Sequence, residues 1–315
     1  MAPRTTVTIP HMHENRHALS HDERRIEQAV LAALADHFAS FVGSRREAYD
    51  AMTAQTPCAD GVAFQRVDET QVHGWWARPK AAPDDRAILF LHGGAYMLGS
   101  AEAYRGFVSQ IAVRAGVAAF VLDYPLAPEH PFPAAYDAVV GASLWLRSQR
   151  IAQLALVGDS AGGGLALAAL SHYPRQAPRV ASVVVFSPWV DLALAGASFT
   201  DPNTPDPIFQ PAALQAAAAT YLDGADPHDG RASPLYAVPD MLPPLAIQVG
   251  SNELLLDDAR RYAAAAAASG GKVQLDIFEG LHHVFQRSTD ALPQARAALD
   301  AAGSFLSSHW VQAAG

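Results

Sequence analysis

The sequence contains a single cysteine, Cys58, among its 315 residues. No disulfide can therefore form within the chain, which fits a reducing compartment. No segment approaches the roughly 18 uninterrupted apolar residues of a membrane span. The charged, His-rich start of the chain also lacks the apolar stretch of a signal peptide. We therefore expect a cytoplasmic protein with no membrane span.

Positive charge is also in short supply. The chain has 22 Lys and Arg against 31 Asp and Glu, a formal net charge of −9. Such an acidic chain is a poor match for nucleic acid or for an anionic membrane surface. Internal repeats and a phosphate-binding Gly-Lys-Ser loop are absent, whereas 50% of the residues are hydrophobic, enough for a sizeable core. The composition favours a small molecule as partner and excludes nucleic acid.

Apolar runs alternate with segments of helical spacing along most of the chain. Strands are expected at residues 62–67, 71–77, 87–91, 117–122, 154–157, 180–186, 245–249 and 273–278. Helices are expected at about 20–40, 104–114, 134–147, 163–170, 211–221, 255–268 and 293–310. After an initial hairpin, this alternation predicts an α/β fold, with a mainly parallel central sheet covered by helices on both faces.

One long segment, about 189–238, interrupts this alternation with proline-rich turns and a single Ala-rich helix. We expect it to lie over the carboxyl edge of the sheet, where ligands bind in open α/β folds. We expect the N-terminal helix to pack against this segment. The interpretation is a single domain over residues 1–315, with a cap formed by about 1–45 and about 189–238.

The most informative motif is Gly158-Asp159-Ser160-Ala161-Gly162, which lies between a predicted strand and a predicted helix. A serine on such a sharp turn projects its hydroxyl at the N-terminus of a helix, and the flanking glycines leave room for the turn. A glycine-rich turn that only packs a helix against a strand is the plainer interpretation. The pattern favours Ser160 as a nucleophile.

An oxyanion site should accompany such a nucleophile. His92-Gly93-Gly94-Ala95 follows an early strand, and we assign the N–H groups of Gly93, Gly94 and Ala161 to this site. An ordinary Gly-Gly turn is the alternative. The position of this loop upstream of the serine turn favours the oxyanion site over that alternative.

A base and an acid are expected on two later loops, in the order serine, acid, histidine. His282 and His283 follow the last predicted strand, and spacing alone does not choose between them. Glu253 follows the preceding strand and is our predicted acid. Asp257 and Asp258 lie inside the next helix, where stabilisation of the helix dipole or a solvated face explains them.

Four motifs in order resemble the bacterial branch of the hormone-sensitive-lipase family, which are α/β-hydrolase carboxylesterases. They are His92 to Tyr96, Asp123 to Ala135, Gly158 to Gly163 and His283 to Phe285, and the resemblance spans about 87–286. It implies an α/β-hydrolase fold with a cap, and a Ser160, Glu253, His283 triad without metal or cofactor. It also implies supporting roles for His92, Asp123 and Glu129.

The chain departs from the family pattern at two places. Many members have Asp-Pro-Leu where this chain has Glu253-Leu254-Leu255, so the carboxylate is one methylene longer. Ala95 replaces a third glycine. The expected reaction is hydrolysis of short- to medium-chain carboxylic esters, because a closing cap limits acyl length.

Other interpretations remain open at this point. A lactone hydrolase, a deacetylase or a lyase would use the same triad, whereas a non-catalytic small-molecule receptor on this fold is disfavoured because the serine, histidine and carboxylate all persist. His11, His13, His17 and His21 suggest a metal site with a shared helical face, but no completing carboxylate or cysteine set is evident. The open edge at the last strand leaves room for a homodimer.

Overall fold

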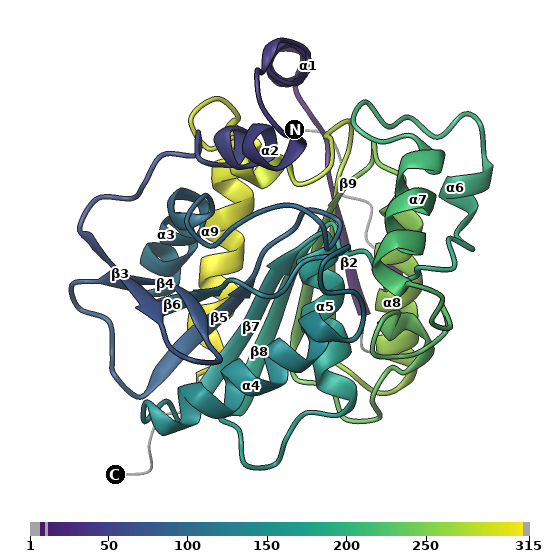
Figure 1. Cartoon of the computed structure of the whole chain (residues 1–315). Coiled ribbons are helices and arrows are strands. Elements are labelled where there is room, and N and C mark those ends of the chain that lie inside the picture. The colour runs from purple at the N-terminus through teal and green to yellow at the C-terminus, as the bar shows by residue number, and fades with distance from the viewer. Residues whose placement is uncertain (1–6, 10–11, 311–315) are drawn as a thin grey trace.

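A ten-stranded sheet forms the centre of the protein, seen in a computed structural model that describes residues 7–9 and 12–310 (Figure 1). The strand order is β1-β2-β10-β9-β8-β7-β5-β6-β4-β3. The strands are β1 (Val7–Ile9), β2 (Met12–His17), β3 (Val62–Asp68), β4 (His73–Pro79), β5 (Arg86–Leu91), β6 (Ala118–Leu122), β7 (Gln153–Asp159), β8 (Arg179–Phe186), β9 (Leu245–Gly250) and β10 (Val273–Phe278). The strands from β2 to β6 in this order are parallel, while β4, β3 and β1 are antiparallel to their neighbours.

Both faces of the sheet are buried, as the alternating pattern predicts. Along β5, Ala87, Leu89 and Leu91 belong to one apolar cluster, while Ile88 and Phe90 belong to the other. All five side chains are fully buried. Because successive side chains of a strand point to opposite faces, a continuous apolar run requires helices on both sides.

The helices supply this cover. Those of the described chain are α1 (His21–Ser40), α2 (Arg45–Thr53), α3 (Arg105–Ala115), α4 (Ala134–Ser148), α5 (Ala161–Ser171), α6 (Ala197–Thr200), α7 (Pro211–Leu222), α8 (Leu256–Ala268) and α9 (Pro293–Ser308), with short 3-10 turns η1 (Pro234–Tyr236) and η2 (Phe285–Arg287). Residues of α3 and α9 pack on one face, and residues of α4, α5 and α8 on the other. The α/β-hydrolase fold and the initial hairpin, β3 with β4, are thereby confirmed.

The N-terminal segment differs from the sequence prediction. Residues 12–17, for which no strand was expected, form β2 and pair in parallel along the whole of β10. The strand escaped prediction because its sequence, Met-His-Glu-Asn-Arg-His, has no apolar alternation. The edge of β10 that would have been open to a homodimer is therefore already occupied within the chain.

The histidine cluster does not share a helical face. His13 and His17 lie in β2, where the His17 imidazole contacts the Asp276 carboxylate at 2.9 Å, and His21 begins α1. His11 falls outside the described residues. Among residues 7–9 and 12–310, no group of three or more His, Cys, Asp or Glu side chains is arranged to hold a metal ion.

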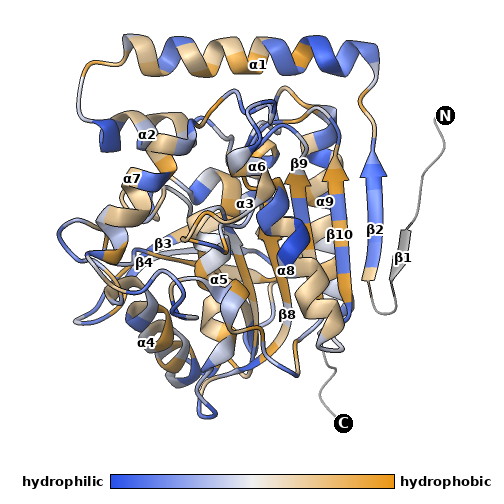
Figure 2. Ribbon diagram, turned by 90° about the vertical axis from the view of Figure 1, so that its right-hand side faces the viewer, coloured by the Kyte–Doolittle hydropathy of each residue, from blue (hydrophilic) through white to orange (hydrophobic). Residues whose placement is uncertain are grey.

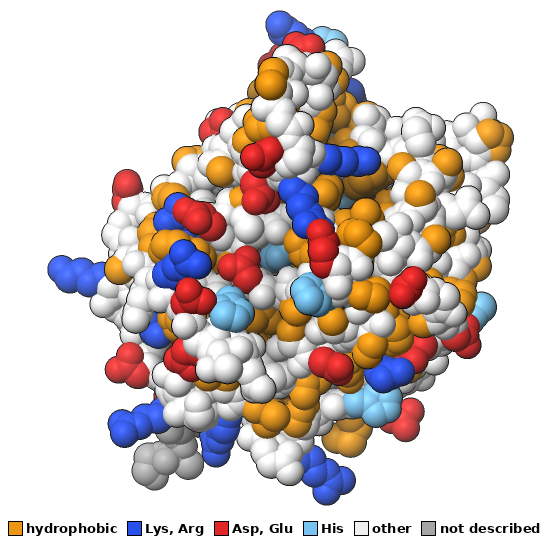
Figure 3. All heavy atoms as spheres, viewed as in Figure 1, with side chains coloured by type: hydrophobic (Ala, Val, Ile, Leu, Met, Phe, Trp, Pro, Cys, Tyr) orange, Lys and Arg blue, Asp and Glu red, His pale blue; other side chains and the backbone are white. Residues whose placement is uncertain are grey.

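Helix α1 crosses above the carboxyl ends of β9 and β10 (Figure 2). Both α1 and α2 begin with a capping box, in which Ser20 pairs with Glu23 and Ser44 with Glu47. None of the helices in the described part of the chain has the length and apolar character that a membrane crossing needs. On the face shown in Figure 3, basic side chains lie among acidic ones and form no continuous patch.

A buried carboxylate holds the segment that follows β8. Asp258 Oδ2, from α8, accepts the backbone N–H groups of Val190 at 2.9 Å and Asp191 at 3.0 Å. The Asp258 side chain is fully buried, and this burial raises its pKa to about 8. Asp191 in turn pairs with Arg261 at 2.6 Å, so α8 fixes the start of the 189–238 segment.

This raised pKa predicts a loss of stability with rising pH. Between pH 4 and pH 8 the folded state holds a proton on Asp258 that the unfolded state has released, so the free energy of unfolding falls as pH rises. We expect the fall between pH 5 and pH 8 to be smaller in Asp258→Asn by a difference on the order of 4 kcal/mol, because the amide keeps an acceptor oxygen and does not titrate. Urea unfolding of the unchanged protein and of Asp258→Asn at pH 5 and pH 8 measures this difference.

The neighbouring substitution Asp257→Asn is the matched control, because Asp257 accepts the Ser198 N–H and leaves the buried site intact. Its pH dependence should follow that of the unchanged protein. Equal pH dependence in Asp258→Asn and the unchanged protein would show that Asp258 is ionised in the fold.

Candidate active site

Ser160 stands at the turn between β7 and α5, as predicted. Its backbone adopts φ 54° and ψ −122°, a strained conformation held by a hydrogen bond from Ser160 N to Phe186 O at 2.8 Å and one from Trp189 N to Ser160 O at 3.0 Å. A Cβ at Gly162 would lie 2.0 Å from Leu91 O. The turn therefore excludes a side chain at Gly162, and the sequence-based reason for this glycine is confirmed.

The loops after β9 and β10 bring a carboxylate and an imidazole together. Glu253 Oε2 lies 2.6 Å from His283 Nδ1, and both side chains are buried. The second oxygen, Oε1, accepts Ser187 Oγ–H at 2.8 Å and Gly250 N–H at 2.7 Å. A carboxylate without solvent needs such donors, and here three of them fix its orientation.

Ser187 is a residue that the sequence analysis missed. It follows β8 with φ 47°, donates its hydroxyl to Glu253 and accepts the Val284 N–H at 3.2 Å. Through these two contacts it joins the Glu253 loop to the His283 loop. Its only sequence signal is one polar residue directly after the buried strand.

The described structure contains no hydrogen bond between the Ser160 hydroxyl and His283. Ser160 is 7% exposed, and the ring of Phe209 meets the His283 imidazole edge-on at 5.0 Å between centroids. Catalytic hydrogen bonds are often long in a free enzyme and tighten when substrate binds. The arrangement therefore joins the His283 imidazole to the Glu253 carboxylate and places Ser160 on a separate, strained turn.

The loop at Gly93 differs from the sequence assignment. Gly93 N–H donates to Asp159 Oδ1 at 2.9 Å and lies 3.1 Å from Tyr104 Oη, so this N–H is already occupied. The local sequence around Gly93 does not reveal this hydrogen bond, because the accepting carboxylate lies on the serine turn. In the described chain, the N–H groups of Gly94, Ala95 and Ala161 have no such partner.

Two buried ionisable groups support this loop. Burial raises the pKa of Asp159, whose Oδ2 accepts the Tyr104 hydroxyl at 2.9 Å. Burial lowers the pKa of His92, which stacks on Tyr124 at 4.3 Å and whose Nδ1 lies 2.8 Å from Gly93 O. The expected supporting role of His92 agrees with these contacts.

The other candidate residues lie apart from the acid–base pair. His282 Nδ1 faces Glu27 at 2.6 Å, and Asp257 and Asp258 hold backbone N–H groups of the 189–238 segment. Asp258 is fully buried, which corrects its assignment to a solvated face. Of the aromatic residues near the site, Tyr96 and Trp189 are core residues, whereas Phe209 contacts the His283 ring.

Glu129 and Asp123 hold neighbouring loops, as the resemblance implies. Glu129 pairs with Arg46 of α2 at 2.6 Å, and Asp123 Oδ1 accepts the Ala101 N–H at 2.5 Å. These contacts fasten α2 and the loop after Gly94 to the body of the fold.

Comparisons with known proteins agree with this geometry. A family profile described as the alpha/beta hydrolase fold matches residues 88–287. The chain is 43% identical over 235 residues to an acetyl-hydrolase of Streptomyces hygroscopicus, covering 73% of this chain and 78% of that protein. It is 37% identical over 226 residues to an esterase of Acinetobacter venetianus, covering 70% and 74%.

Solved structures extend the likeness to almost the whole chain. The crystal structure of an esterase from the bacterial hormone-sensitive lipase family superposes with a TM-score of 0.84 and 37% sequence identity, covering 92% of this chain and 99% of that one. The chain therefore belongs to the α/β-hydrolase family, in the hormone-sensitive-lipase group of carboxylic-ester hydrolases.

Proposed function

We propose that this chain hydrolyses short- to medium-chain carboxylic esters with Ser160 as nucleophile, His283 as base and Glu253 as acid. The 2.6 Å contact between Glu253 and His283 carries the proposal, because a buried carboxylate on Nδ1 leaves Nε2 to act as the proton acceptor. The strained turn at Ser160 supports the choice of nucleophile.

In this mechanism His283 takes the Ser160 proton as the hydroxyl attacks the ester carbonyl. Glu253 holds the imidazole in one tautomer and stabilises the cation that forms. The alcohol leaves with a proton from His283, and water then hydrolyses the acyl-enzyme by the same steps. Ser187 and Gly250 keep the Glu253 carboxylate in place throughout.

The oxyanion donors in this proposal are the N–H groups of Gly94, Ala95 and Ala161. Gly93 is omitted because its N–H is held by Asp159. Ala161 is the first residue of α5, so its N–H is free of a helical partner and lies at the positive end of the helix dipole. Gly94 has φ 117° and Ala95 φ 54°, and their N–H groups have no hydrogen-bond partner among the described residues.

The proposed cap consists of α1, α2 and the 189–238 segment. The sequence prediction places all of about 1–45 in the cap, but residues 12–17 belong to the central sheet, because they pair with β10. Contacts of Arg46 with Glu129 and of Phe209 with His283 support its place over the serine turn. A cap at this position limits the length of the acyl chain. The acetyl-hydrolase of Streptomyces hygroscopicus, as a relative, favours the short end of this range.

Substitution of the three triad residues tests the assignment. With p-nitrophenyl esters, Ser160→Ala and His283→Ala should each lower kcat by roughly 10⁴-fold or more, because nucleophile and base act as a unit. Glu253→Ala should lower kcat by less. The matched control is Asp257→Ala, on the same connection after β9. A greater loss of kcat in Asp257→Ala than in Glu253→Ala would assign the acid to Asp257. Activity that survives in Ser160→Ala would contradict the whole mechanism.

Chain length is tested with p-nitrophenyl esters from acetate to palmitate. We expect kcat/KM to be highest for the short and medium acyl chains and to fall for the long ones, because the proposed cap closes the acyl site. Preference for palmitate over butyrate would contradict the cap as a limit on length.

A further inference from the structure

Helix α1 buries one residue, and that residue is the charged Glu27. Its side chain is 5% exposed, whereas the rest of α1 is partly or fully exposed. A buried carboxylate is costly unless specific donors compensate it. Glu27 therefore marks the point at which α1 is fastened to the fold.

Its partner is the residue that precedes the proposed base. Glu27 Oε1 accepts the backbone N–H of His282 at 3.0 Å and lies 2.6 Å from the His282 ring Nδ1. The first contact holds the peptide that joins His282 to the preceding loop residue. The second holds the side chain of His282 away from the Glu253 site.

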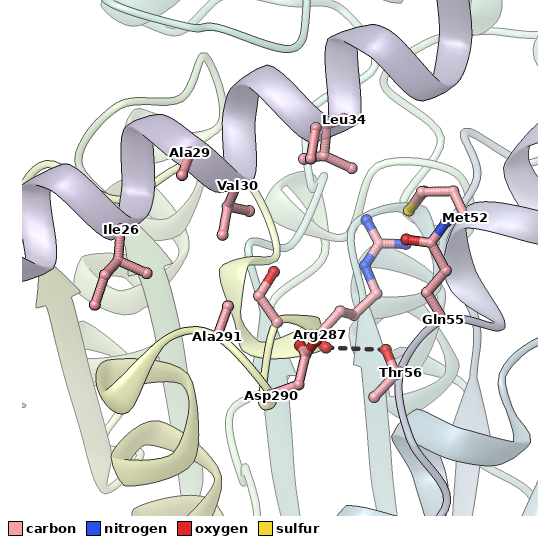
Figure 4. A pocket seen from close by; sticks show the side chains of 12 residues that line it. Ile26, Ala29, Val30, Leu34, Met52, Gln55, Thr56, Arg287, Asp290 and Ala291 are labelled. Carbon is pink, nitrogen blue, oxygen red and sulfur yellow. Dashed lines mark hydrogen bonds between the residues drawn. The ribbon is translucent and has the colours of Figure 1, made fainter. Parts of the chain in front are cut away.

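The apolar contacts of α1 come from Ile26 and Val30, which pack against the cluster that contains Leu281 and Phe285. A cavity of about 360 Å³ lies between α1, α2 and the loop after His283. Ile26 and Val30 of α1 face Ala291 and Arg287 across this space (Figure 4). The Glu27 contact therefore adds a directed polar anchor to this apolar packing and helps to fix the position of α1 over the loop.

A second carboxylate makes the same kind of contact from the 189–238 segment. Asp206 Oδ2 accepts the backbone N–H of Leu254, the residue after Glu253, at 2.8 Å. Asp206 Oδ1 also accepts the Phe209 N–H at 2.8 Å, and the Phe209 ring meets the imidazole of His283. Each of the two proposed cap segments thus holds a peptide N–H beside one member of the acid–base pair.

We infer that Glu27 and Asp206 are positioning residues, through which the two cap segments set the alignment of His283 with Glu253. The inference rests on the proposed triad. Neither carboxylate touches the reacting atoms, so each acts through the loop that it holds. Loss of either contact should slow proton transfer more than it weakens binding, since small displacements of a base are costly to the rate.

Substitution of Glu27 tests this with p-nitrophenyl acetate and the full-length chain. We expect Glu27→Ala to lower kcat about tenfold with KM changed less than about twofold. Glu27→Gln keeps an oxygen that accepts the His282 N–H, and should restore kcat to within about threefold of the unchanged protein. Gln28→Ala is the matched control, because Gln28 is the exposed neighbour on α1. Its kcat should not change.

Asp206 supplies the second test. Asp206→Ala should lower kcat in the same way, while Asp201→Ala should not, because Asp201 lies in the same segment and its carboxylate accepts hydrogen bonds from the nearby Asn203 and not from the Glu253 loop. If Glu27→Ala does not fold, as judged by circular dichroism, Glu27→Asp replaces it. That variant keeps the charge and loses the reach to His282.

Two results would overturn the inference. An unchanged kcat with a raised KM in the Glu27 and Asp206 variants would show that the segments only cover the substrate. Failure of Glu27→Gln to recover activity would show that the N–H contact is not the cause. Ser160→Ala is assayed beside them to separate the two proposals. If Ser160→Ala stays active, the proposed triad is wrong. If Ser160→Ala is inactive and Glu27→Ala keeps its full kcat, only the positioning role is wrong.

Discussion

Burial of the Glu253 carboxylate constrains the rest of the site. A charged group with no solvent contact must be surrounded by donors, and the three it finds come from three different loops: Ser187 after β8, Gly250 at the end of β9 and His283 after β10. These strands are neighbours in the sheet and run parallel, so their carboxyl ends lie side by side. The geometry of the proposed acid–base pair is therefore a consequence of strand order, and the sheet, covered on both faces, supplies a rigid support for it.

A second buried carboxylate, Asp159, has the corresponding role beside the proposed nucleophile. It precedes Ser160 on the turn and binds the Gly93 N–H, which ties the serine turn to the loop proposed to stabilise the oxyanion. The two carboxylates differ in what they hold: Glu253 orients a side chain, and Asp159 orients a backbone. Between them, the strained φ of Ser160 is maintained by hydrogen bonds with Phe186 at the end of β8 and with Trp189 after it.

Much of this arrangement could be predicted from the sequence, because the decisive signals are local. The apolar runs identify the central strands. Gly158 and Gly162 identify the turn, because only residues without a side chain fit there. What escaped prediction depends on contacts distant in sequence. The sequence of β2 is polar, and only its pairing with β10 shows that it forms a strand. The occupied N–H of Gly93, the bridging Ser187 and the buried Glu27 each require a partner from another loop.

The most direct test of the account concerns the hydrogen bond between Glu253 and His283. A short bond from a buried imidazole N–H to a carboxylate shifts its proton strongly downfield in the ¹H NMR spectrum. Two buried pairs fit this description, His283 with Glu253 and His282 with Glu27, so we expect two such resonances in the unchanged protein. One should be lost in Glu253→Ala and in His283→Ala and persist in Ser160→Ala and in His282→Ala, whereas the other should be lost in His282→Ala alone. Survival of both resonances in Glu253→Ala or in His283→Ala would contradict the assignment of the acid–base pair.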